Sequence, residues 1–143
     1  MKLREPRCYS MKRELAKKVS EAYLKQGVIY DIFSQDPKSV LRDKISKIKG
    51  HGFAEKYVNR YGQELSELGD FFIAAAERCR SNSQLYADAA TSRIPYLLIY
   101  PSFLLKKITE DPRIVEEKMM WHRFEMDLKE YGNDAKLAVI HRP

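Results

Sequence analysis

Positively charged side chains gather in two stretches of the chain. Residues 1–18 hold seven Lys and Arg against two acids, and residues 38–60 repeat those numbers, so each stretch carries +5 while the whole chain carries +6. Cations at several helical positions can neutralise phosphates without reading the base sequence. The candidate phosphate-binding residues are Arg4, Arg7, Lys12, Arg13, Lys17 and Lys18 in the first stretch, and Lys38, Arg42, Lys44, Lys47, Lys49, Lys56 and Arg60 in the second.

The second stretch has a pattern that suits a nucleic-acid backbone. At 100° per residue, the helical positions of Lys38, Arg42 and Lys49 lie within about 40° of one another. Tyr57 and Tyr61 stand beside basic residues, and an exposed tyrosine there could stack on a base. The alternative is that the lysines only solvate helix faces and that the tyrosines are core residues. No zinc-finger, RNP, KH or dsRBD signature is visible.

Residues suited to catalysis or metal binding are scattered. His51, His122 and His141 fall in different predicted elements and form neither an HxxxH nor an HExxH motif. Cys79 lies on an apolar helix face, and Cys8 has no identifiable base nearby. The acids of the last predicted helix alternate with bases, as on a solvent-exposed face. We therefore expect no catalytic site, no metal site and no cofactor.

The elements that would position the basic residues are helices, and one of them has a heptad seam. Its apolar residues follow one another at intervals of 3 and 4 residues: Val58, Tyr61, Leu65, Leu68, Phe72, Ala75 and Cys79. This spacing predicts one long helix over about 53–80 that lies lengthwise against a partner helix. Beside the seam, Gly62, Gly69 and Ala76 recur every seventh residue, which favours a close approach of the two backbones. We expect the partner helix to come from this chain rather than from another, although a kink at Gly62 is an alternative.

Helix signals also organise the N-terminal half. Ser10 is a good N-cap for a first helix that is expected to run to about residue 25, before Gly27. Residues 28–33 are predicted to form a helical turn or an extended segment. Asp36 followed by proline begins a second helix, which is expected to end at Gly50.

The C-terminal half continues in the same way. Residues 81–83 are predicted to form a turn before a further helix, and prolines suggest one or two short buried helices over 94–108. Asp111 followed by proline begins the last helix, which stops before Gly132. Its apolar face is formed by Ile114, Trp121, Phe124, Leu128 and Tyr131.

These signals predict an all-α, single-domain bundle of about five helices. Residues 1–143 would form one helical domain, with a flexible N-terminus (1–9) and a C-terminal tail (134–143) that is loose or docks on another chain. A hydrophobic content of 44% with 32% charged residues is typical of a folded soluble protein. We expect no membrane insertion and a cytoplasmic location, since no apolar stretch spans a bilayer and the two cysteines are isolated.

The function predicted from this pattern is non-catalytic. We expect a small basic helical subunit that binds nucleic-acid backbone, RNA or DNA, without strong sequence preference and within a larger nucleoprotein complex. Small subunits of RNA-guided effector complexes have this general format, but this is an analogy only, because no motif in the sequence supports that family over others. We also expect protein partners or self-association. The alternative function is a helical protein–protein adaptor or a structural subunit of a multiprotein assembly. The apolar segment 94–105 and the three methionines Met119, Met120 and Met126 would form either core or a partner surface, and we expect core.

Overall fold

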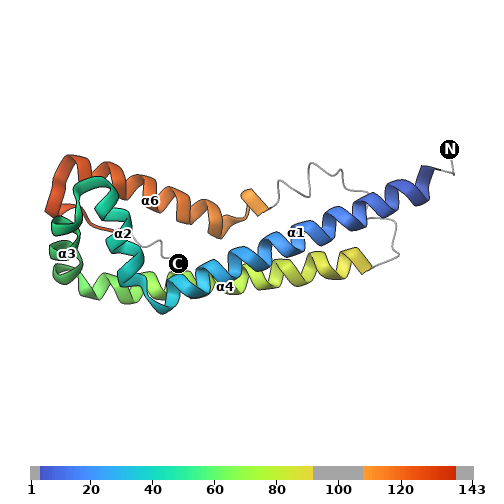
Figure 1. The fold of residues 1–143 in the computed structure, drawn as a ribbon, viewed down its shortest axis with the longest axis horizontal. Coiled ribbons are helices and arrows are strands. Elements are labelled where there is room, and N and C mark those ends of the chain that lie inside the picture. Colours follow the sequence, from blue (N-terminus) through green and yellow to red (C-terminus); the bar gives the residue numbers. More distant parts are fainter. Residues whose placement is uncertain (1–3, 92–107, 138–143) are drawn as a thin grey trace.

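The computed structural model describes residues 4–91 and 108–137, with side chains from residue 13 onward (Figure 1). Within these residues the chain is all-α and contains no strand. The elements are α1 (Arg4–Gln35), α2 (Pro37–Lys49), α3 (His51–Arg60), α4 (Gly62–Thr91), α6 (Pro112–Tyr131) and the short 3-10 helix η2 (Gly132–Asp134). The predicted all-α bundle is confirmed. None of the described helices is long and apolar enough to cross a membrane.

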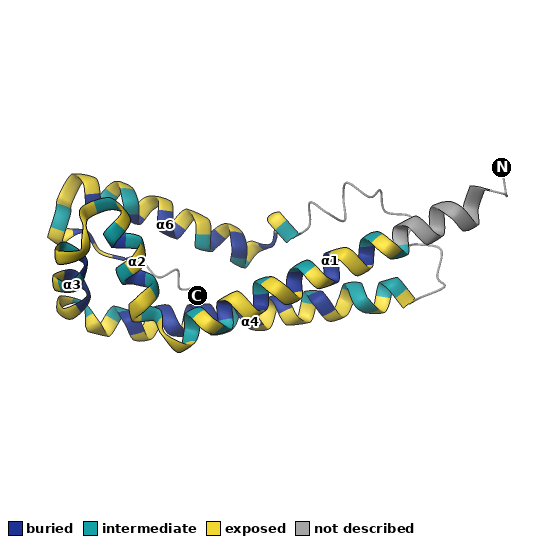
Figure 2. Ribbon diagram, in the orientation of Figure 1, coloured by how far each residue is buried: buried dark blue, intermediate teal, exposed yellow. Residues whose placement is uncertain are grey.

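The spine of the fold is an antiparallel pair of long helices, α1 and α4, whose buried faces turn toward each other (Figure 2). Small residues recur every seventh position on both helices and meet in register. The pairs are Ser20 with Ser83, Gly27 with Ala76, and Ser34 with Gly69. At the first pair each serine hydroxyl donates to the carbonyl of the other residue, at 2.7 and 2.9 Å.

These small residues let the two backbones approach closely. A Cβ atom placed on Gly27 would lie 3.4 Å from the Cβ of Cys79 and 3.6 Å from the carbonyl of Ala76. At Gly69 it would lie 3.7 Å from the carbonyl of Ser34. The prediction of close packing is confirmed at Gly69 and Ala76, with the partner helix supplied by this chain. It is wrong at Gly62, where a Cβ would meet nothing within 4 Å.

Helix α1 begins ahead of Ser10 and extends ten residues past its predicted end near residue 25. Residues 28–33 are helical, and the extended alternative is wrong. Tyr30 supplies the physical reason, because only a continuous helix keeps it on the face that already buries Tyr23 and Gly27. Its fully buried ring stacks on Phe72 of α4, with 6.0 Å between centroids. Tertiary burial here outweighs the strand propensity of a β-branched run.

The long helix predicted over 53–80 is two helices, and the alternative of a kink at Gly62 is correct to within one residue. Tyr61 leaves the helical region (φ −110°, ψ 39°) and separates α3 from α4. Two features favour the break: the tyrosine hydroxyl donates to the carbonyl of Asn133 at 2.6 Å, and Gly62 follows with low helix propensity. The predicted turn at 81–83 is also wrong, because α4 continues to Thr91 and buries Ser83 against α1.

The two Asp-Pro signals are confirmed as helix starts. The Asp36 carboxylate accepts from the backbone N–H of Ser39 at 3.1 Å, and α2 ends where Gly50 adopts φ +90°. The buried Asp111 carboxylate accepts from the N–H of Arg113 at 3.0 Å. It also accepts from Arg78 of α4 at 3.4 Å and from Asn82. Asp111 therefore caps α6 and ties its start to α4.

Helix α6 runs back along α4, from this tie toward α3. Trp121 lies near Phe72 with 6.5 Å between ring centroids, and Phe124 packs edge-on against Tyr57 of α3 at 5.6 Å. The predicted core face of α6 is confirmed except at Tyr131, which is exposed. Three methionines of α6 were expected in the core. The expectation is confirmed for Met120, which is buried, and is wrong for Met119 and Met126, which are exposed.

The residues after η2 lie against α3 of the same chain. Ala135 and Leu137 are buried, and the hydroxyl of Tyr57 donates to the carbonyl of Ala135. The short helices expected within 94–108 fall outside the described residues, apart from the helical turn that begins at Ile108.

Candidate nucleic-acid interface

The structure places the two basic stretches on different parts of the molecule. The first lies on α1 and the second on α2 and α3, at the end of the bundle to which α1 leads (Figure 1). At 1.5 Å per residue, Lys18 is about 25 Å along α1 from Gln35. The two stretches therefore form separate surfaces.

The α1 surface is of mixed charge where its side chains are described. Arg4, Arg7 and Lys12 lie on α1, but their side chains fall outside the description. Lys17 and Lys18 are exposed, and Arg13 is half-buried. Arg13 and Lys17 share the lining of a hollow of about 590 Å³ with two acids, Glu14 and Glu21. Those carboxylates weaken the local positive field.

On α2 and α3, three of the seven predicted cations form ion pairs. Arg42 is bound to Glu55, which ties α2 to α3. Lys47 pairs with Asp43 at 3.4 Å. Arg60 lies 3.9 Å from Asp134 and over the ring of Tyr61. Because Glu55 neutralises the charge of Arg42, the predicted charged face of Lys38, Arg42 and Lys49 on α2 is reduced to the two lysines.

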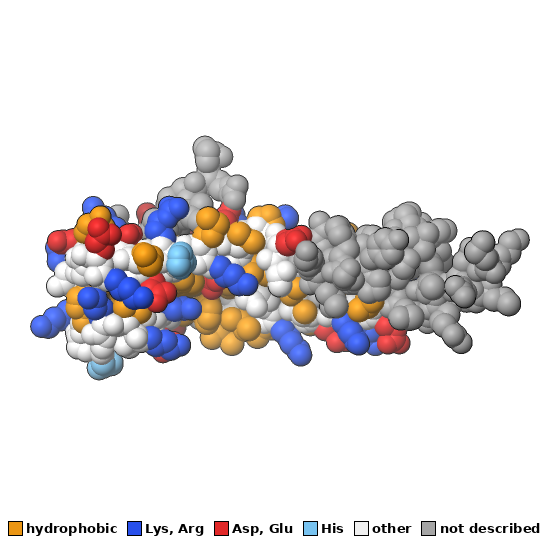
Figure 3. Space-filling view, turned by 90° about the horizontal axis from the view of Figure 1, so that it is seen from above, with side chains coloured by type: hydrophobic (Ala, Val, Ile, Leu, Met, Phe, Trp, Pro, Cys, Tyr) orange, Lys and Arg blue, Asp and Glu red, His pale blue; other side chains and the backbone are white. Residues whose placement is uncertain are grey.

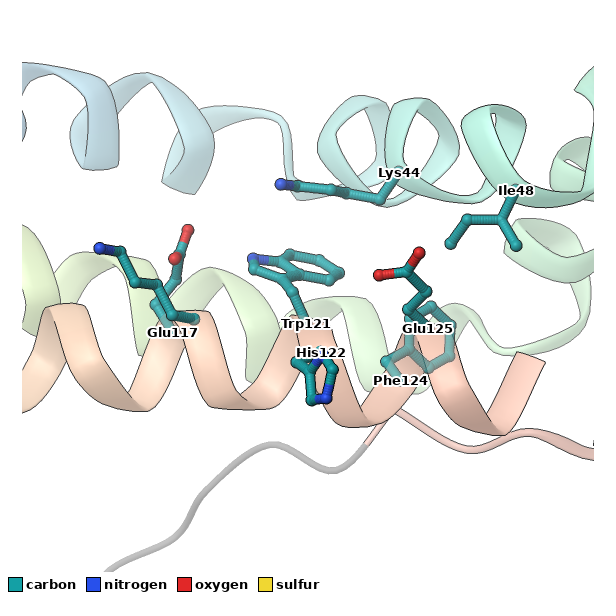
Figure 4. A pocket seen from close by; sticks show the side chains of 8 residues that line it. Lys44, Ile48, Glu117, Trp121, His122, Phe124 and Glu125 are labelled. Carbon is teal, nitrogen blue, oxygen red and sulfur yellow. The ribbon is translucent and has the colours of Figure 1, made fainter. Parts of the chain in front are cut away.

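Lys44 is held in a pocket of about 290 Å³ between α2 and α6 (Figure 4). Its ammonium lies over the indole of Trp121, 5.3 Å from the ring centroid, with Glu117 and Glu125 to either side. Sequence reasoning missed this pocket, since nothing in the sequence joins residue 44 to residue 117. The lining contains two lysines, Lys44 and Lys118, and two carboxylates, Glu117 and Glu125, so the pocket has no excess of positive charge to add to a phosphate-binding surface.

The remaining three predicted cations are Lys38, Lys49 and Lys56, which we call the α2–α3 lysines. All three are exposed, and none forms an ion pair with another described residue. Lys38 and Lys49 are eleven residues apart on α2, which puts them on one side of that helix about 16 Å apart. Lys56 follows Glu55, the residue that joins α3 to α2. Figure 3 shows Lys and Arg side chains around this end of the molecule.

The two tyrosines predicted as stacking partners for bases are otherwise engaged. Tyr57 is buried, and its ring packs against Phe124 and Tyr61. Tyr61 is half-buried, with its hydroxyl bound to the carbonyl of Asn133. The alternative interpretation, that these rings belong to the core, is correct for Tyr57.

Of the residues considered for catalysis, the side chains of Cys8 and His141 fall outside the description, and Cys79, His51 and His122 lie on three different helices. Burial raises the pKa of the Cys79 thiol to about 12, so the thiol stays protonated at neutral pH. His51 lies 3.8 Å from Glu55, and His122 is exposed on α6. Among the described residues, no group of three His, Cys, Asp or Glu side chains could hold a metal ion.

Replacing Glu117 with glutamine is expected to stabilise the fold at pH 7. Burial raises the pKa of Glu117, and the ammonium of Lys44 only partly offsets this. Because the folded-state pKa is the higher one, the native state loses stability as pH rises from the unfolded-state value, near 4.3, through the folded value. Urea unfolding should give Glu117→Gln the higher midpoint at pH 7, with the difference vanishing near pH 4. A constant difference across that range would exclude titration of Glu117 as its cause.

Comparison of the chain with protein-family models, with curated proteins and with solved structures gave no match.

Proposed function

We propose that this protein binds nucleic-acid backbone through the end formed by α2 and α3, without strong sequence preference. The observation that carries the proposal is the charge balance of that end. Residues 38–60 hold seven Lys and Arg against two acids, Asp43 and Glu55, and both acids are already paired with cations. The α2–α3 lysines (Lys38, Lys49 and Lys56) remain exposed for an anionic partner.

The residue types favour phosphates over base edges. Arginine is the side chain that most often reads guanine in the major groove, and both arginines here are in ion pairs. Lysine acts as a point charge and does not distinguish one phosphate from the next. Three such contacts to duplex DNA would give a slope of about −2.7 in log affinity against log salt, and about −2.1 for a single strand.

Reversing two of these charges should remove most of the affinity. We expect Lys38→Glu with Lys49→Glu to weaken binding about tenfold or more. For each lysine replaced, the salt slope should become less steep by about 0.9 on duplex DNA and by about 0.7 on a single strand. The measurement is fluorescence polarisation of labelled single- and double-stranded RNA and DNA over a salt titration. The matched control is Lys25→Glu with Arg123→Glu, which makes the same change in net charge on exposed positions of α1 and α6.

Three results would contradict the proposal. One is an absence of affinity for all four nucleic acids at low salt. Another is an equal loss in the control variant, which would assign binding to net charge rather than to α2 and α3. The third is an affinity that does not change with salt.

A protein-binding role is the second candidate, and a specific observation favours it. Leu24, Val28 and Ile32 are spaced by four residues on α1 and are 52–59% exposed, and α6 carries further exposed apolar residues. Large exposed apolar side chains in series are typical of interaction surfaces. The lysines would then serve to keep the subunit soluble.

A further inference from the structure

Helix α6 has a second apolar stripe on the side away from the core. Val115, Met119 and Met126 are 37%, 56% and 54% exposed, and His122 is exposed between the two methionines. We call these four residues the outer stripe. Their spacing of 4, 3 and 4 residues is that of a heptad seam. Figure 3, which views the side on which α6 lies, shows hydrophobic side chains and a histidine exposed there.

The outer stripe is not the fringe of the core. The core face of α6 is formed by Ile114, Trp121 and Leu128, all buried. At 100° per residue the outer stripe is centred on roughly the opposite side of the helix. A helix with two apolar faces is expected to have a partner on each. Among the described helices, α4 and α2 pack against the inner face, and His122 at the edge of the outer stripe also lines the pocket beside α2.

We propose that the outer stripe pairs with the same stripe of a second copy of this chain, with the two α6 helices antiparallel about a twofold axis. The axis would pass between residues 120 and 121. In this register Val115 packs against Met126 of the second copy, and Met119 packs against His122 of the second copy. Each contact occurs twice, as an isologous interface requires. This proposal goes beyond nucleic-acid binding and does not depend on it.

The charges beside the stripe select this orientation. Lys118 and Glu125 flank the outer stripe on the side of the α2–α6 pocket, seven residues apart, and Glu125 also pairs with Lys129 at 3.5 Å. In the antiparallel register each Lys118 faces Glu125 of the second copy, which gives two pairs of opposite charge. A parallel pair would place Lys118 against Arg123 and Glu125 against Glu130, which are like charges. The charges of α6 are therefore complementary to those of a second α6 only when the two helices are antiparallel.

The composition of the stripe indicates a weak, adaptable association. Methionine side chains are flexible and fit surfaces that re-pack. Specific interfaces at the small end of the range bury about 1,200 Å². A contact limited to one face of α6 is therefore expected to have a Kd on the order of micromolar.

Sedimentation equilibrium of the full chain without nucleic acid tests the proposal. The expected result is a monomer–dimer equilibrium that Met119→Glu abolishes, because the exposed position allows folding but places a carboxylate in the seam. Lys118→Glu and Glu125→Lys should each weaken the dimer about tenfold, because each creates two like-charge contacts. The double variant Lys118→Glu/Glu125→Lys should restore it. The matched control is Ile32→Glu on the exposed stripe of α1, which should leave the dimer intact.

Several outcomes would overturn this assignment. A wild-type chain that stays monomeric at all concentrations excludes it. A dimer that survives Met119→Glu and is lost in Ile32→Glu moves the interface to α1. Tighter association of Lys118→Glu would indicate a parallel pair, since the new carboxylate would then face Arg123. If the double variant did not recover the affinity, the predicted pairing of Lys118 with Glu125 of the second copy would be excluded.

Discussion

Replacing Phe72 with alanine is expected to lower the free energy of unfolding by about 3–5 kcal/mol. The side chain is fully buried, and its ring lies within 6.5 Å of the rings of Tyr30, Phe33, Phe71 and Trp121. These neighbours come from α1, α4 and α6, so the cavity would open where the three helices meet. Urea denaturation followed by circular dichroism measures the loss directly.

The matched substitution is Phe72→Leu, which keeps most of the volume and should cost about 1–2 kcal/mol. Met119→Ala, on the exposed side of α6, should change stability by less than about 0.5 kcal/mol. If Phe72→Ala cost no more than the substitution at Met119, α6 would not be packed on the α1–α4 pair as described.

The second large effect is expected at Gly27, and its sign depends on the size of the new side chain. Gly27→Leu should destabilise the fold by about 1–3 kcal/mol or more, because the branched chain would overpack the contact with Cys79 and Ala76. Gly27→Ala should instead stabilise by up to about 1 kcal/mol, because its Cβ would make an ordinary 3.4 Å contact and alanine favours the helix. Thermal and urea unfolding of both variants would measure the two effects.

Gly62 provides the control for this pair. It begins α4, and a Cβ atom there would have no neighbour within 4 Å, so leucine at this position should not clash. A Gly27→Leu variant as stable as Gly62→Leu would show that α1 and α4 are not in close contact at this level.

The heptad pattern in the sequence was sufficient to predict the α4 side of the contact between α1 and α4. Leu65, Leu68 and Phe72 are apolar at heptad spacing, and hydrophobic periodicity finds such a face. On α1, the two small residues closest to α4, Ser20 and Gly27, were not predicted as contacts because one is polar and the other lacks a side chain. Their repeat at intervals of seven becomes visible only beside the matching repeat on α4.

Local signals and tertiary contacts contributed differently to the remaining predictions. The Asp36 and Asp111 caps are set by neighbouring residues, and both were predicted correctly. The break at Tyr61 lies next to Gly62, where the sequence suggested a kink as the alternative to one long helix. The hydrogen bond from Tyr61 to Asn133, 72 residues away, is a contact that a local pattern cannot show. The exposure of Met119 was missed for a similar reason, because apolar character alone does not say which side of a helix is covered.

The candidate interface was predictable as a set of residues but not as a surface. Counting charges identified the basic stretch 38–60, and the structure places that stretch on α2 and α3. Which cations remain available depends on partners such as Glu55 and Asp134, and on the pocket that holds Lys44. Those partners are fixed by the fold.

The register of small residues between α1 and α4 also bears on the order in which the chain folds. Ser34 meets Gly69 across 35 residues, whereas Ser20 meets Ser83 across 63. The entropy of closing a loop grows with its length, so the contact beside α2 and α3 is the least costly to form first. Each later contact then adds only seven residues to each helix. We therefore expect the antiparallel pair of α1 and α4 to form first at the end beside α2 and α3 and to extend from there toward Ser20 and Ser83. Because α3 lies in the segment that connects α1 to α4, we expect it to be part of the structure that forms first.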